Sequence, residues 1–207
     1  MKRTRRKSRL LLDADGVLLD FVGGFLKAVR EAGGPVLSPE DFPEWDVFET
    51  LKENLAKTHS PEDTRRIMKE VNAAVVRRGF CLELEPLPGA VEAVKAIQAA
   101  EHLELFVITS HFGSNETWVH ERDSSLKKHF GIAGKQILHG SSKHIVSGDI
   151  FVDDKVDNVT SWMDHNDGAA FLWDTPHNRG FQGVRIDGRS VRRLTSWGEL
   201  LDILRIS

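Results

Sequence analysis

Short apolar runs alternate along this chain with longer segments in which apolar residues recur every three to four positions. The short runs predict buried strands at residues 10–12, 103–108, 136–138, 150–152 and 169–173. The longer segments have the periodicity of amphipathic helices. Strands that alternate with helices favour a parallel sheet with right-handed crossovers, so the pattern predicts an α/β fold built on a doubly wound parallel sheet.

The segment from residue 21 to residue 79 differs from the rest because it has helical periodicity and no strand pattern. Within it, Ser38 and Ser60 each precede a proline and two acidic residues, which is the pattern of a helix N-cap. An all-helical block directly after the first strand is typical of a lid over the strand ends. We therefore expect a core made of residues 1–20 and 80–207, with a small helical cap inserted at residues 21–79.

Composition and charge place the chain among soluble globular proteins. Of its 207 residues, 40% are hydrophobic and 29% are charged, and the net charge of -3 argues against a nucleic-acid partner. No apolar run approaches the roughly 18 residues of a membrane span. The single cysteine, Cys81, excludes an internal disulfide and suits a reducing, cytoplasmic environment.

The first nine residues are strongly basic. They are expected to be a solvated terminus, with a nucleic-acid contact or a targeting signal as alternatives. A homodimer is compatible with the sequence.

Two carboxylates follow the first strand, at Asp13 and Asp15, and Gly16 comes directly after them. This order predicts acidic groups in a tight turn at the carboxyl end of a strand, where open α/β sheets carry out their chemistry. Neighbouring carboxylates repel each other unless a cation or a proton offsets the charge, which suggests a divalent metal with oxygen ligands. An ordinary strand-to-turn junction with solvated Asp side chains would have the same residues.

Further groups of matching chemistry lie later in the chain. The strand at residues 103–108 is followed by Thr109 and Ser110, and the strand at residues 150–152 by Asp153 and Asp154. Between them lies Lys143, where a short helix is expected to begin. Parallel strands bring their carboxyl ends to one edge of the sheet, so the order of these groups predicts a site for a phosphate and Mg²⁺.

With these motifs the chain resembles the haloacid dehalogenase superfamily of phosphohydrolases, and within it the 5′(3′)-deoxyribonucleotidases in particular. The four superfamily signatures are matched by residues 13–17, Ile108-Thr109, Lys143 and Asp153-Asp154. The likeness to the deoxyribonucleotidases depends mainly on residues 13–26 and 82–95. The resemblance implies the same α/β fold with a helical cap inserted after the first strand.

The resemblance also implies a role for each catalytic group. Asp13 would attack phosphorus and form an aspartyl-phosphate. Asp15 would give a proton to the leaving oxygen and later take one from water, which requires surroundings that favour the protonated carboxyl. Lys143, Thr109 and Ser110 would bind the phosphoryl oxygens.

Magnesium is the cofactor that the resemblance implies. Its protein ligands would be the Asp13 carboxylate, the Asp15 backbone carbonyl and the Asp154 carboxylate, with water and a phosphate oxygen completing an octahedron. Asp153 would lie beside these ligands without binding the metal, although the sequence alone leaves open which carboxylate of the pair touches it. The cation would offset the repulsion between Asp13 and the phosphate.

Selectivity is expected to come from the cap. By resemblance Phe21 would contact the base and Trp45 would be a second stacking wall, with a place in the helical core as the alternative for Phe21. Val75 stands where the family has another cap tryptophan, which puts the leaving group in doubt. The expected activity is Mg²⁺-dependent hydrolysis of a small phosphomonoester substrate, a deoxynucleoside monophosphate. The alternatives are a phosphatase for a sugar phosphate or phosphoglycolate, and a binding protein without turnover.

Overall fold

A parallel sheet forms the centre of the structure, a computed structural model that describes residues 6–181, 183, 185, 186 and 188–206. Within these residues the sheet has six strands in the order β3-β2-β1-β4-β5-β8. Their bounds are β1 (Ser8–Leu12), β2 (Leu103–Thr109), β3 (Ile137–His139), β4 (Ile150–Asp153), β5 (Ala169–Trp173) and β8 (Arg192–Leu194). A separate antiparallel pair joins β6 (Arg185–Ile186) and β7 (Arg189–Ser190). Strand β1 lies between β2 and β4, so the carboxyl ends of these three strands share one edge.

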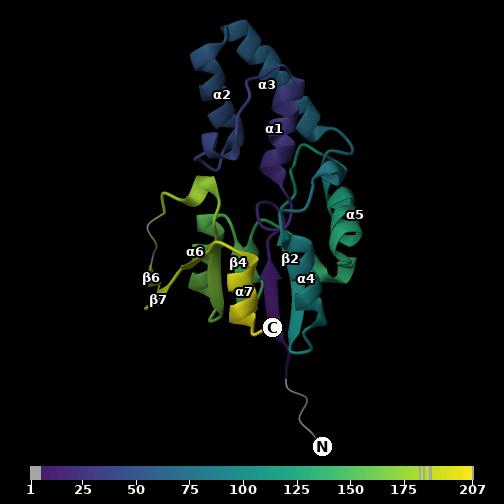
Figure 1. The fold of residues 1–207 in the computed structure, drawn as a ribbon, viewed down its shortest axis with the longest axis vertical. Helices are drawn as coiled ribbons and strands as arrows, with labels where there is room; N and C mark the ends of the chain where they lie inside the picture. Colours follow the sequence, from purple (N-terminus) through teal and green to yellow (C-terminus); the bar gives the residue numbers. More distant parts are fainter. Residues whose placement is uncertain (1–5, 182, 184, 187, 207) are drawn as a thin grey trace, which may run out of the picture.

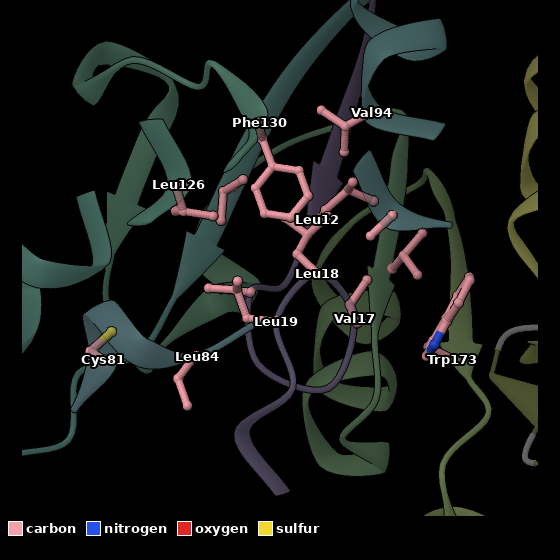
Figure 2. Packing of buried hydrophobic residues seen from close by; sticks show 14 of the residues in the cluster. Leu12, Val17, Leu18, Leu19, Cys81, Leu84, Val94, Leu126, Phe130 and Trp173 are labelled. Atoms are coloured by element: carbon pink, nitrogen blue, oxygen red, sulfur yellow. The ribbon is translucent and has the colours of Figure 1, made fainter. Parts of the chain in front are cut away.

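Helices cover both faces of the sheet, which confirms the predicted α/β fold. Their bounds are α4 (Ala90–Ala99), α5 (Trp118–Phe130), α6 (Val156–His165) and α7 (Trp197–Leu204). Successive side chains of a strand point to opposite faces. Leu12 accordingly belongs to one buried cluster with Val94 of α4 and Phe130 of α5 (Figure 2). Leu11 belongs to a second cluster, with Trp162 of α6.

Three helices fill the segment between the first strand and the rest of the core, and no strand occurs among residues 21–79, as the sequence predicts. They are α1 (Phe21–Glu31), α2 (Val47–Thr58) and α3 (Pro61–Val76). Figure 1 places all three together at the end of the molecule toward which the strands of the sheet point. Ser60 caps α3 through its side chain, whereas Ser38 caps only one 3₁₀ turn and Asp46 caps α2.

The turn after β1 fixes where the first carboxylates lie. Gly16 has a φ of +73°, and a Cβ at this position would come within 1.9 Å of Asp154 Oδ2. A side chain would therefore be both strained and obstructed here, so glycine is required. The chain then makes backbone hydrogen bonds with the segment that returns from α3, from Asp20 N to Glu85 O and from Leu87 N to Leu18 O.

Two elements of the core are absent from the sequence-based prediction. Helix α6 is one, and strand β8 is the other, because Arg192 and Arg193 interrupt any apolar run. The basic terminus is also shorter than expected, since β1 begins at Ser8 and Arg6 Nη2 lies 2.6 Å from Asp149 Oδ1; residues 1–5 lie outside the described part. In the described part, no helix has the length and apolarity needed to cross a membrane.

Candidate active site

A buried ion cluster lies at the carboxyl edge of the sheet, where β1 and β4 end. Lys143 Nζ lies 2.7 Å from Asp13 Oδ1 and 2.7 Å from Asp153 Oδ2. Lys143 begins a short 3₁₀ turn, Lys143–Ile145, and its side chain is only 2% exposed. The expected convergence of Asp13, Lys143 and Asp153 is thus present, in a place where the three groups are shielded from water.

Asp154 completes a set of three carboxylates that fits a cation. Asp13, Asp153 and Asp154 each offer one oxygen, and these oxygens lie within 4.8 Å of one another. Asp153 is already occupied, because it accepts hydrogen bonds from Lys143 Nζ, Lys155 N and Asn158 Nδ2. Asp154 Oδ1, in contrast, is buried and has no hydrogen-bond partner among the described residues. A buried carboxylate oxygen without a partner is costly, and a hard divalent cation would satisfy it.

The crowding of these carboxylates changes their protonation. Burial raises the pKa of Asp13 to about 7, since the desolvation of the carboxylate and the nearby Asp153 outweigh the attraction of Lys143. Burial also raises the pKa of Asp154 well above its ordinary value. Burial opposes the charge on Lys143, but the Asp13 and Asp153 carboxylates overcome this and raise its pKa. Without a cation, Asp13 is therefore partly protonated near neutral pH, and a bound cation would favour its ionised form.

Asp15 points to a different partner. Its two oxygens lie 2.7 and 2.6 Å from Arg122 Nη2 of helix α5, and the Asp15 side chain is 23% exposed while Arg122 is fully buried. The carboxylate to which the sequence assigns proton transfer is therefore in direct contact with a buried arginine of helix α5.

Thr109 and Ser110 lie at the end of β2, on the same sheet edge as Asp13. Leu12 pairs with Val107, so the strand register brings Thr109 alongside the turn that follows β1. The Thr109 hydroxyl is buried and donates to Ser110 O at 3.3 Å, and the Ser110 hydroxyl donates to Gly140 O at 3.4 Å. Both hydroxyls are thus near the carboxylates and, in this arrangement, are bonded to backbone carbonyls.

An aromatic cavity of about 460 Å³ opens beside Asp15, between helices α1 and α2 and the core. Its aromatic walls come from Phe21, Trp45, Phe48, Phe112 and Trp118. The Phe21 ring contacts Trp118, with a centroid distance of 6.3 Å. Both residues that the sequence assigns to the substrate pocket, Phe21 and Trp45, therefore line this cavity.

Trp45 also joins the helical segment to the core. Its ring lies 4.9 Å from the ring of His177, in an edge-to-face arrangement, and Lys155 Nζ lies 4.8 Å from its centroid. His177 in turn bonds the Asp154 backbone carbonyl, at 3.2 Å. Trp45 is thus connected through one side chain to the segment that carries the carboxylates.

Sequence reasoning missed Arg122, His177 and the aromatic walls Phe48 and Phe112. Arg122 had a usable signal, because it lies four residues after Trp118 and four before Leu126, within the apolar stripe of helix α5. A charged residue in such a stripe needs a buried partner, and Asp15 is that partner. Aromatic residues in a helical pattern, in contrast, look the same whether they fill a core or line a cavity.

Comparisons with known proteins show which family the chain belongs to. Residues 7–206 match the family described as 5′ nucleotidase, deoxy (Pyrimidine), cytosolic type C protein. The mitochondrial 5′(3′)-deoxyribonucleotidase of Mus musculus is 31% identical over 203 residues, which are 96% of this chain and 85% of the relative. The cytosolic-type 5′(3′)-deoxyribonucleotidase of Homo sapiens is 28% identical over 206 residues, covering 97% of this chain and 96% of the relative.

A solved structure gives independent support for the fold. A HAD family hydrolase from Deinococcus radiodurans R1, solved with bound phosphate and sodium, superposes with a TM-score of 0.61 at 17% sequence identity. The superposition covers 96% of this chain and 95% of the other. This likeness concerns the fold, whereas the family match extends over nearly the whole sequence. The fold is thus that of a HAD hydrolase, and the chain belongs to the deoxy 5′ nucleotidases of cytosolic type C.

Proposed function

We propose that this protein is a Mg²⁺-dependent phosphatase that hydrolyses deoxynucleoside monophosphates to nucleoside and phosphate. The observation that supports this most directly is the joining of two features in one place. Buried carboxylates and Lys143 lie at the sheet edge, and an aromatic cavity large enough for a nucleoside opens beside Asp15. The relatives named as deoxyribonucleotidases support the same substrate class.

Asp13 is the nucleophile in this proposal. Its carboxylate oxygen attacks phosphorus, the bond from phosphorus to the sugar oxygen breaks, and an aspartyl-phosphate forms. Lys143 lies 2.7 Å from Asp13 and so holds this carboxylate in place while its charge offsets that of the phosphoryl oxygens. Thr109 and Ser110 donate to those oxygens after their hydroxyls leave the backbone carbonyls that they now contact.

Asp15 moves the protons. It gives one to the departing sugar oxygen, and it takes one back from the water that attacks the aspartyl-phosphate, so that phosphate leaves and Asp13 is restored. Its position in the lining of the aromatic cavity supports this role, since the leaving nucleoside would occupy that cavity.

The carboxylates of Asp13 and Asp154 would hold Mg²⁺, and the Asp15 backbone carbonyl would be a third ligand. Asp154 is preferred to Asp153 because Asp154 Oδ1 lacks a partner among the described residues, while both Asp153 oxygens are bonded. When bound, Mg²⁺ supplies positive charge that offsets the repulsion between Asp13 and the phosphate.

Residues 21–79 act as the cap in this proposal. Phe21 and Trp45 of this segment line the cavity, and the contact of Trp45 with His177 and Lys155 supports closure of the segment over the site. We assign the protein to the cytoplasm, in line with its cytosolic-type relative and with Cys81, which is buried and unpaired.

A phosphate-release assay across a panel of monophosphates tests the proposal. The panel contains deoxynucleoside 5′- and 3′-monophosphates, 2-deoxyribose 5-phosphate, glucose 6-phosphate and phosphoglycolate, each with Mg²⁺ and with EDTA. We expect the highest kcat/KM for deoxynucleotides, and loss of activity in EDTA. Equal or higher kcat/KM for the sugar phosphates or phosphoglycolate would replace this substrate class with that of another small phosphomonoester. No turnover of any member would contradict the enzyme assignment.

A further inference from the structure

Arg122 is a buried charged side chain that the mechanism above does not use. It lies in helix α5, far from the sequence motifs of the site, and it is fully buried. Its Nη2 atom contacts both oxygens of Asp15, at 2.7 and 2.6 Å. The carboxylate that moves protons in the proposed reaction is therefore held through one nitrogen of one side chain.

Burying this guanidinium is costly, which argues against a merely structural role. Among the described residues, Nε and Nη1 of Arg122 have no hydrogen-bond acceptor. The guanidinium carbon lies 5.0 Å from the centre of the Trp118 ring, whose face attracts a cation but accepts no conventional hydrogen bond from these nitrogens. An apolar residue would fit the stripe of α5 between Trp118 and Leu126 without this cost. Among the residues that the structure describes, Asp15 is the one carboxylate in ion-pair contact with Arg122, and this contact accounts for arginine here.

The neighbouring residue fixes helix α5 against the segment that returns from α3. Glu121 accepts hydrogen bonds from Gly79 N at 2.7 Å, Cys81 N at 3.2 Å and the Thr117 hydroxyl at 2.6 Å. Glu121 is itself only 2% exposed. Arg122 thus extends from a helix that is anchored one residue away, so the position of its Nη2 atom is well defined.

We propose that Arg122 is a positioning residue that orients the Asp15 carboxylate toward the leaving oxygen of the substrate. This inference rests on the proposed phosphatase function. One Asp15 oxygen stays on Arg122 Nη2 while the other carries the proton. That proton passes to the sugar oxygen as the bond from phosphorus to this oxygen breaks and the Asp13 oxygen bonds to phosphorus. In the second half of the reaction the same oxygen accepts a proton from the attacking water.

Leaving groups that differ in their need for a proton test this role. A nucleoside leaves as an alcohol and needs the proton, whereas p-nitrophenolate leaves readily without one. The value of kcat/KM reports the first chemical step, in which the leaving group departs. For Arg122→Met we expect kcat/KM to fall about 100-fold for a deoxynucleoside 5′-monophosphate, but less than about 5-fold for p-nitrophenyl phosphate. Arg122→Lys, which keeps a donor, should recover part of the loss on the nucleotide alone.

Arg189→Met is the matched control. Arg189 is a partly buried arginine that donates to the backbone carbonyls of Met163, Asn166 and Gly168 and touches no residue of the site. We expect this variant to lose thermal stability while kcat/KM changes by a similar small factor on both substrates. Melting temperatures of all variants show whether a loss of activity comes from misfolding or from a misplaced Asp15 carboxylate.

The outcomes are distinguishable. An equal loss on both substrates for Arg122→Met, with no recovery in Arg122→Lys, would overturn the positioning role while leaving the phosphatase intact. A wild-type protein without activity on either substrate would instead overturn the proposed function.

Discussion

The carboxylate cluster and the aromatic cavity lie next to each other but are built in opposite ways. The cluster comes from the ends of two adjacent strands, β1 and β4, and from Lys143, and its groups are shielded from water. The cavity is lined by side chains from α1, α2, α5 and several loops, and Trp45 on its wall is 46% exposed. One region is charged and fixed by strand register, whereas the other is apolar and depends on how helices pack.

In the proposed reaction, this difference separates the chemistry from the selectivity. The sheet edge would position the groups that act on phosphorus, which every phosphomonoester carries. The aromatic walls have no groups for that chemistry, but they would contact the leaving group, which differs from one substrate to another. Changes in the cluster should therefore affect all substrates alike, and changes in the cavity should affect substrates according to what they carry beyond the phosphate.

The largest expected effect comes from Asp13→Asn. An amide cannot form the aspartyl-phosphate, so we expect kcat to fall by roughly 10⁴-fold or more on every substrate. Acid-quenched protein incubated with radiolabelled substrate should retain no phosphate. The variant should be folded, because a neutral side chain relieves the repulsion with Asp153 and Asp154. Asp149→Asn, at the opposite edge of the sheet, is the control and should keep near wild-type kcat. Appreciable turnover by Asp13→Asn would show that the cluster is not the reaction centre.

The two regions also differ in how much of them the sequence predicts. Asp13 and Asp153 are predictable because each follows an apolar strand directly and parallel strands bring their ends together, and Lys143 is predictable from its place between these motifs. Arg122 is signalled only as a charge within an apolar stripe. Its partner Asp15 is 107 positions away, and only the folded chain shows their contact.

The elements of the fold divide in the same way. Strand β5 is predicted with its exact bounds, residues 169–173, from an apolar run. Strand β8 is missed because its arginines are stabilised in the strand by residues outside it. Arg193, for example, donates a hydrogen bond to Asp174. Patterns local in sequence are therefore predictable, and groups whose role is decided by a distant partner are not.

Removing the metal should have the next largest effect, a pH-dependent loss of folding stability that comes from the carboxylate cluster. Asp13 has its pKa raised to about 7 in the folded, metal-free protein, against 3.8 ordinarily, so folding favours its protonated form. Stability from this source is present below pH 4 and is lost as the pH rises toward 7, by roughly 4 kcal/mol at about 1.4 kcal/mol per pKa unit. We expect urea unfolding in EDTA to show lower stability at pH 8 than at pH 5.

Two comparisons make this prediction specific. Asp13→Asn lacks the titrating group and should show a smaller fall between pH 5 and pH 8, which separates Asp13 from other titrating residues. Mg²⁺ should stabilise the wild type more at pH 8 than at pH 5, because cation binding requires ionised carboxylates. A metal-free wild type that loses no more stability than Asp13→Asn over this range would contradict the raised pKa of Asp13.

The smallest expected effect is in the cavity, for Phe21→Leu. Leucine keeps most of the volume but loses the aromatic face, so we expect KM for a deoxynucleotide to rise about 10-fold while kcat changes less than about 2-fold. KM for 2-deoxyribose 5-phosphate, which carries no base, should stay unchanged. Phe25→Leu, one turn along the same helix but outside the cavity, is the control and should lower stability without changing either KM. If Phe21→Leu raised both KM values equally, Phe21 would be a core residue of its helix, and selectivity would lie with the other walls.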